Sequence, residues 1–274
     1  MSQTPTIQLI KLIQPTPPRM HVRRWNWPPL ILLLVLALIW EIVPRATASI
    51  HFPPLSAVLH ALVVNAPEIA WHIMHTLRRA AAGFALALVT MVPLGIVIGR
   101  NRILAQLLEP VIDLLRPLPP IAIIPVVMLF AGIGDAAKIS VITFAAAFPI
   151  LIHAIDGVRG IHPMYHTVSR AMRLTLNESR FLVDLRALLP VLFMGIRLAV
   201  ANALLVAVTS EMLMSTDGIG LFILHAQERF QMAKGLAGIL VVAVLGWMIN
   251  RLIIAADRRL LSWHHATTGA QRAL

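Results

Sequence analysis

Ionisable residues are rare inside the long apolar stretches of this chain of 274 residues, and they are the first candidates for chemistry. Glu109, Asp113 and Arg116 follow one another at helical spacing, so their side chains can face one another on a helix. Arg197 and Glu211 share a later apolar stretch. Ionisable groups at membrane depth are costly and usually face a partner or a cavity. We expect a buried Asp113–Arg116 pair or, alternatively, that Arg116 or Arg197 helps an anionic solute to pass. For Glu211, a structural role in helix packing is at least as much expected as contact with the solute.

Enzyme chemistry is not indicated by these charges or by the rest of the chain. No nucleophile–base pair stands near them, and the 11 histidines show no HExxH spacing. There are 0 cysteines, so a thiolate metal site and disulfides are excluded. A GxxxxGK[ST] phosphate-binding loop is absent as well. We therefore predict no catalytic residue, no metal and no cofactor bound by this chain.

The composition requires a lipid environment. Hydrophobic residues make up 58% of the chain, charged residues only 13%, and the mean hydropathy is +0.82. A soluble protein carries about a quarter charged residues. The net charge of +11 does not indicate nucleic-acid binding, because the arginines stand beside apolar segments and only 1 tyrosine is present to stack on bases. Basic residues at the cytoplasmic ends of spans explain the excess.

The elements that position the candidate residues are apolar helices of about 20 residues each. We predict an all-α, polytopic membrane domain over residues 28–256, in which Pro44 stops the first helix. Five prolines between 110 and 125 break the third apolar region, which should therefore face protein or a cavity. Six spans are expected, near 28–43, 78–99, 103–133, 137–155, 187–213 and 234–256.

The distribution of arginines predicts the orientation. Six spans place the tails, 1–27 and 257–274, on one side of the membrane together with the arginine-rich segment 156–186. Because positive residues concentrate in the cytoplasm, we expect both termini and this segment to be cytoplasmic.

Several short motifs follow one another in a characteristic order and spacing over about residues 50–260. They are Thr76-Leu77-Arg78-Arg79, Pro119 to Pro125, Phe130 to Gly134 with Lys138, Phe148-Pro149-Ile150, Asp156 to Arg159, Gly195 to Leu198, Glu211-Met212-Leu213 and Gly218-Ile219-Gly220. Together they resemble the permease family of importers for sulfonates, taurine and nitrate, within the type I ABC importers. The resemblance implies a MetI-like fold and the translocation of a small, anionic solute across a bacterial inner membrane. It also implies a second permease subunit, two ATP-binding subunits that bind the ATP, and a solute-binding protein.

In that family a short cytoplasmic coupling helix with a Glu-Ala-Ala…Gly signature contacts the ATP-binding subunit. Here the signature falls on Thr167-Val168-Ser169 and its glycine on Arg173. Because arginine lacks the conformational freedom of glycine, we expect the turn at Arg173 to differ or to continue as helix. The degenerate loop suggests a heterodimer with a more typical permease, or a homodimer with an altered ATP-binding partner. The residues expected to contact that partner are Met164, Tyr165, Thr167, Val168, Ser169, Arg170, Met172, Arg173 and Leu174.

The expected translocation path includes Arg116, Pro120, Arg197 and Glu211. Two rival interpretations remain. An intramembrane enzyme would need inward-facing catalytic pairs, and an ATP-independent secondary carrier would show inverted repeats with two similarly broken helices. Only one strongly broken region is evident, which favours the importer.

Overall fold

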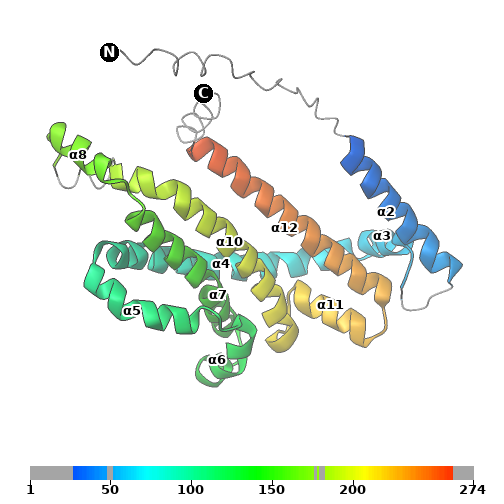
Figure 1. Ribbon diagram of the computed structural model, residues 1–274. Coiled ribbons are helices and arrows are strands. Elements are labelled where there is room, and N and C mark those ends of the chain that lie inside the picture. Colours follow the sequence, from blue (N-terminus) through cyan, green and yellow to red (C-terminus); the bar gives the residue numbers. More distant parts are fainter. Residues whose placement is uncertain (1–26, 48–51, 176–177, 179–182, 262–274) are drawn as a thin grey trace, which may run out of the picture.

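A computed structural model describes residues 27–47, 52–175, 178 and 183–261 (Figure 1). Most of the two predicted tails therefore lies outside the described residues. Within the described part every regular element is a helix, which confirms the all-α prediction. In chain order the helices are α2 (Trp27–Ala46), α3 (Leu55–Val64), α4 (Ala66–Arg100), α5 (Arg102–Leu115), η2 (Pro120–Ile123), α6 (Ile124–Ala131), α7 (Asp135–Arg159), α8 (Pro163–Ala171), α10 (Leu185–Met214), α11 (Ile219–Glu228) and α12 (Met232–Leu260).

Four of these helices, α4, α7, α10 and α12, are long and apolar enough to cross a membrane. A fifth candidate span consists of α5 and the η2–α6 segment, which meet at a bend of 89°. The prolines predicted to break this region stand at and around the bend. The expected first span coincides with α2, which has 20 residues but is not among the four or five candidates. The count of six spans thus remains a prediction.

Three helix boundaries differ from those expected. The prediction that Pro44 stops the first helix is wrong, because α2 continues to Ala46; a proline in the last turn removes little of the hydrogen-bond ladder. Helix α4 begins at Ala66 rather than near residue 78, with Pro67 in its first turn, where the missing N–H costs nothing. Helix α7 runs to Arg159 and so includes the first residues of the segment expected to be a loop.

Helices α4 and α7 lie side by side and run parallel. A Cβ atom built on Gly83 would lie 2.6 Å from Ile142, and one built on Gly95 would lie 2.5 Å from Ala154. These glycines therefore permit backbone contact that any side chain would prevent. Small residues at helix interfaces provide close van der Waals packing where lipid removes the usual hydrophobic driving force.

Helix α10 packs antiparallel on the other side of α7. Gly157 of α7 faces Leu188 near the start of α10, and Gly195 faces Pro149 and His153 earlier in α7. Buried alanines of both helices belong to the shared hydrophobic core, at positions 145, 146, 154, 199, 203 and 207. Helices α4, α7 and α10 thus form the rigid centre of the chain, with α11 and α12 packed against α10 (Figure 1).

Candidate functional site

A cavity of about 240 Å³ lies beside the bend of the broken span. Arg116 and Pro120, two of the residues predicted to line the translocation path, come together in its wall. The opposite walls come from α7 and α10. The side chains from those helices include Phe144, Phe148, His153, Leu198 and Asn202. A single cation, one amide and one imidazole in an otherwise apolar cavity are suited to a small polar solute.

The imidazole of His153 is oriented by its own helix. Its Nδ1 lies 2.8 Å from the Pro149 carbonyl oxygen, which can only accept a hydrogen bond. Nδ1 therefore carries the proton and, in the neutral ring, Nε2 remains an acceptor. Because Gly195 packs directly against the His153 side chain, the ring is also held from α10.

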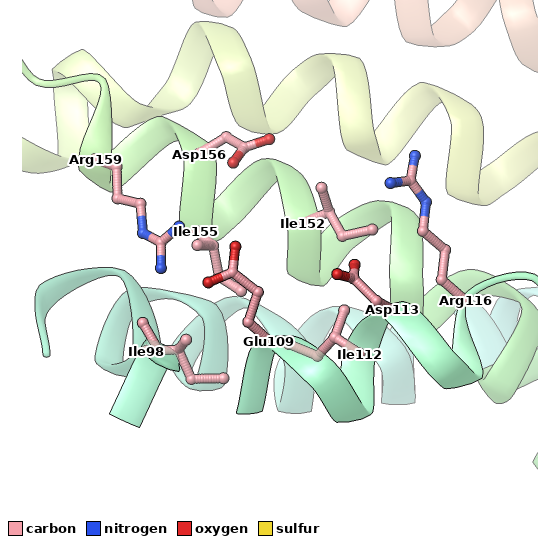
Figure 2. A pocket seen from close by; sticks show the side chains of 10 residues that line it. Ile98, Glu109, Ile112, Asp113, Arg116, Ile152, Ile155, Asp156 and Arg159 are labelled. Carbon is pink, nitrogen blue, oxygen red and sulfur yellow. The ribbon is translucent and has the colours of Figure 1, made fainter. Parts of the chain in front are cut away.

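Arg116 also lines a second cavity, of about 200 Å³, between α5 and α7 (Figure 2). Four more charged side chains surround it: Glu109 and Asp113 from α5, and Asp156 and Arg159 from α7. The prediction of a buried Asp113–Arg116 pair is wrong. Both side chains are exposed, and among the described residues no carboxylate lies within 4.0 Å of Arg116. Arg116 is the residue after the last one of α5, and in Figure 2 its guanidinium lies apart from the Asp113 carboxylate.

Arg197 lies apart from these cavities. Its Nε donates a hydrogen bond to Oδ1 of Asn250 in α12, at 2.9 Å. Both residues stand in a mainly apolar groove between α10 and α12, of about 500 Å³. The structure thus brings Arg116 and Pro120 together but places Arg197 on another face of α10.

Glu211 belongs to a third place, a buried cluster of charges that joins three helices. Its side chain is fully buried and its Oε1 accepts a hydrogen bond from Nη1 of Arg79, at 2.9 Å. Its Oε2 accepts from Oγ1 of Thr76 at 2.7 Å and from the backbone N–H of Gly220 at 3.2 Å. Because both carboxylate oxygens are hydrogen-bonded to protein groups, this position favours the packing alternative for Glu211.

Arg79 is the centre of this cluster. It is 2% exposed, and its Nε donates to Oδ1 of Asp135 at 2.7 Å, while Nη2 donates to Asp217. Lys138, also buried, approaches Asp135 and donates to Oγ of Ser215 at 2.8 Å. Burial alone would raise the pKa of Asp217, but the hydrogen bond and charge of Arg79 hold it below its ordinary value.

Sequence reasoning missed the cluster, although most of its members stand in the motifs quoted above. The residue types were visible: two adjacent arginines, one lysine and one glutamate close to apolar spans. Their mutual contact was not visible in the sequence, because Arg79 and Glu211 are separated by 132 positions. Only the parallel packing of α4 and α7 brings Arg79 beside Asp135.

The predicted coupling residues lie on and just after α8, a short helix between α7 and α10. Figure 1 shows α8 at one extremity of the molecule, beyond the ends of the long helices. Met164, Tyr165, Val168 and Met172 expose large apolar side chains there, between 48% and 68% of their area. Ser169 is buried and donates to the Tyr165 carbonyl. An exposed apolar surface flanked by arginines is typical of a protein contact.

The expectation for the turn after α8 is wrong. Arg173 adopts the left-handed backbone, with φ of 54°, where we expected arginine to avoid it. Its N–H donates to the Arg170 carbonyl at 3.0 Å, and the N–H of Leu174 donates to the Ser169 carbonyl at 3.0 Å. These two bonds form a Schellman motif, in which the left-handed residue is usually glycine. Satisfying the last carbonyls of α8 offsets the strain at Arg173.

Thr175 and Glu178 follow as a capping box. Oε2 of Glu178 accepts hydrogen bonds from the backbone N–H and the hydroxyl of Thr175, both at 2.8 Å. The Glu178 N–H in turn donates to Oγ1 of Thr175 at 3.3 Å. The Thr175 backbone N–H lowers the pKa of Glu178 below its usual range. Such a reciprocal pairing is the pattern of a helix N-terminus; residues 179–182 lie outside the part of the chain that the structure describes.

Solved structures with the same arrangement of helices are ABC transporter subunits. The chain aligns with a chain from the inward-facing MetNI methionine ABC transporter with a TM-score of 0.59, at 19% identity, covering 71% of this chain and 95% of that one. It aligns with a chain from an amino acid ABC transporter with histidines with a TM-score of 0.55, at 11% identity, covering 75% and 96%. The fold is therefore that of a MetI-like ABC transporter permease.

The family model described as "Binding-protein-dependent transport system inner membrane component" matches residues 91–262. The chain belongs to this family of ABC importer permeases. It is 29% identical to the putative aliphatic sulfonates transport permease protein SsuC of Bacillus subtilis, over 90% of this chain and 91% of that protein. It is 28% identical to the taurine transport system permease protein TauC of Escherichia coli, over 90% and 96%. Identity to the bicarbonate transport system permease protein CmpB of Synechococcus elongatus is 31%, over 70% and 69%.

Proposed function

We propose that this chain is the membrane-spanning subunit of a bacterial importer that moves a small anion inward at the expense of ATP. It works with a second permease subunit, two ATP-binding subunits and an external solute-binding protein. ATP is bound and hydrolysed by the ATP-binding subunits, and this chain binds no cofactor of its own.

The position of α8 is the observation that carries this proposal. Helix α8 is short, has an exposed apolar face and lies between the ends of α7 and α10. A movement of a protein bound to this face is therefore transmitted directly to both long helices. When ATP closes the paired ATP-binding subunits, α8 moves with them. Because α7 and α10 pack through backbone contacts at Gly157 and Gly195, the two helices move as one body and open or close the cavity at Arg116.

The anionic character of the solute is inferred from Arg116 and from the relatives. Arg116 is a cation at a cavity wall with no carboxylate within 4.0 Å among the described residues, so it is available to a solute anion. The named relatives carry sulfonates, taurine and bicarbonate, each of which presents an anionic group to a transporter. Arg197 and Glu211 have protein partners, and we assign the first contact with the anion to Arg116.

The orientation follows from the same helix. With α8 in the cytoplasm, α7 and α12 run inward, and both termini are cytoplasmic, as the positive-inside rule predicts. The buried cluster at Arg79 then lies near the external ends of α4, α7 and α10. The solute-binding protein is expected to contact the loops near Gly132–Lys138 and Thr216–Leu224.

Charge reversal in the coupling segment tests the proposal. The complete transporter carrying Arg170→Glu and Arg173→Glu is reconstituted in proteoliposomes with its binding protein. Uptake of radiolabelled ethanesulfonate, taurine, nitrate and bicarbonate is measured with and without internal ATP. We expect ATP-driven accumulation of at least one anion by the wild type, and a loss of at least about tenfold in the double variant, as for a truncated interface hot spot.

The matched control is Arg258→Glu with Arg259→Glu, which reverses two exposed arginines at the last turn of α12, on the same side of the membrane. Uptake by the control should stay near the wild-type level. Equal uptake in the coupling variant and the wild type would refute the role of α8. Accumulation that continues without ATP would instead favour a secondary carrier. The chain alone should hydrolyse no ATP above background.

The composition of the permease pair is tested by the intact mass of the purified complex. A single permease mass supports a homodimer, in which the ATP-binding partner has adapted to the degenerate signature. Two permease masses support a heterodimer with a subunit that keeps the Glu-Ala-Ala…Gly signature.

A further inference from the structure

Arg116 stands in the walls of two cavities at once. One is the solute cavity beside Pro120 and His153, and the other is the charged cavity between α5 and α7. Since the guanidinium terminates a long flexible side chain just beyond the end of α5, it can reach into either space. The two cavities therefore offer Arg116 two different sets of partners. The inference drawn from this rests on the proposed function.

The charged cavity offers carboxylates. In Figure 2, Glu109 and Asp113 lie between Arg159 at one end of the cavity and Arg116 at the other. Asp113 precedes Arg116 by three positions, so the two occupy neighbouring places at the end of α5. Glu109 lies one further turn away, toward Arg159. Asp113 is thus the carboxylate of α5 that Arg116 can meet with the smallest movement.

A transporter needs this second set of partners for a physical reason. A lone cation in a partly dehydrated cavity attracts an anion far more strongly than it would in water. Passage requires binding that is favourable enough for entry and weak enough for departure. If Arg116 had no alternative partner, the anion would remain with it.

We propose that Asp113 is a positioning residue that draws Arg116 out of the solute cavity and so releases the anion. With solute present, Arg116 faces the cavity beside Pro120. When the helices reorient, Arg116 turns toward Asp113, the ion pair replaces the contact with the solute, and the anion leaves. Among the described residues no carboxylate lies within 4.0 Å of Arg116, so forming this ion pair requires the Arg116 side chain to turn toward Asp113.

The test is the steady-state uptake of the complete transporter in proteoliposomes, using whichever of ethanesulfonate, taurine, nitrate or bicarbonate the wild type accumulates. Asp113→Asn keeps the shape of the side chain and removes its negative charge. We expect its apparent KM to fall and its maximal rate to fall, each by about tenfold, as for loss of one charge–charge interaction in a partly hydrated site. Asp113→Glu restores the carboxylate and should bring both values back to near the wild type.

Glu109→Gln is the matched control, because it removes a carboxylate of the same cavity that lies further from Arg116. Its KM and maximal rate should change by less than about twofold, since the attraction weakens with distance and hydration. Arg116→Gln should raise KM, and Asp113→Asn should have no further effect on KM in that background. An equal effect of Glu109→Gln, or an unchanged KM in Asp113→Asn, would overturn the inference.

A second measurement covers variants that assemble poorly or transport too slowly. The chain has 0 cysteines, so Leu118→Cys gives this subunit a single thiol, on an exposed residue in the wall of the solute cavity. The rate of modification by a neutral maleimide is measured with and without millimolar ethanesulfonate, in purified complex without binding protein. Protection by ethanesulfonate should be stronger in Asp113→Asn and absent in Arg116→Gln.

The outcomes separate this inference from the proposed function. ATP-driven uptake by the wild type with no effect of Asp113→Asn on either KM or protection would refute the role of Asp113 and leave the importer intact. Absence of ATP-driven uptake of all four anions, together with no protection at Leu118→Cys, would remove the anion path and the inference with it.

Discussion

Arg79 of α4 and Glu211 of α10 form an ion pair in which both side chains are buried, with Nη1 and Oε1 at 2.9 Å. The pair ties the last turn of α10 to α4, and Asp135 joins it from the first turn of α7. Neither charge has access to water. An isolated charge at such a place would be very costly, so the cluster is stable only as a complete set.

Removing one member should therefore destabilise the chain strongly. Arg79→Leu leaves Glu211 buried without its cationic partner, and we expect a loss of about 3–5 kcal/mol of stability. The measurement is the thermal midpoint of the detergent-solubilised complex, followed by fluorescence-detected size exclusion. Arg78→Leu provides the control. Arg78 also contacts Asp135, at 2.7 Å, but its side chain is 65% exposed, so its loss should cost no more than about 1 kcal/mol.

Gly218 should be intolerant of any side chain for two reasons. Its φ is +107°, and its backbone packs directly on the Glu211 carboxylate. Gly218→Ala should cost about 1–3 kcal/mol of backbone strain, and more through displacement of Glu211. Gly132→Ala separates the two effects, because Gly132 has φ of +71° but nothing within 4 Å of a built Cβ. If the two variants have the same thermal midpoint, the contact with Glu211 contributes nothing to the loss of stability in Gly218→Ala.

The glycines between α4 and α7 should set the distance between these helices. A Cβ on Gly95 meets the Ala154 Cβ at 2.5 Å, so Gly95→Ala should destabilise by about 1–3 kcal/mol. In Gly246→Ala, on α12, the nearest atom is 3.5 Å away, an ordinary contact. That variant should be neutral or more stable by up to about 1 kcal/mol, since alanine favours the helix. Thermal midpoints in the same detergent measure both, and equal losses would argue against close α4–α7 packing.

Arg173→Gly should strengthen the turn after α8. Glycine adopts the left-handed backbone without the cost of about 1 kcal/mol that a Cβ imposes. Hydrogen exchange measures the change, because the amide of Leu174 is bonded to the Ser169 carbonyl; its protection should rise by about fivefold. Met172→Gly should lower this protection, since Met172 has φ of −80° and gains nothing from glycine. Reduced protection in Arg173→Gly would show that the arginine side chain itself stabilises the turn.

The features that sequence reasoning predicted correctly depend on residues close together in the chain. The break between α5 and α6 follows from prolines that cannot donate hydrogen bonds, and the long apolar helices follow from hydropathy. Boundaries were less accurate, as at Pro44 and Ala66, because a proline near a helix end is tolerated. The turn at Arg173 was mispredicted because the hydrogen bonds to Ser169 and Arg170 outweigh the preference of a single residue.

By itself, the sequence determined that the chain is a helical membrane protein with a broken span and a basic segment, since composition, hydropathy and proline act locally. Only the tertiary structure decided which charges meet. It joined Arg79 to Asp135, Glu211 and Asp217, it gave Arg197 a partner in Asn250, and it left Arg116 between two cavities. The reason is that each of these arrangements depends on how α4, α5, α7, α10 and α12 pack, and helical spacing along one segment carries no information about another.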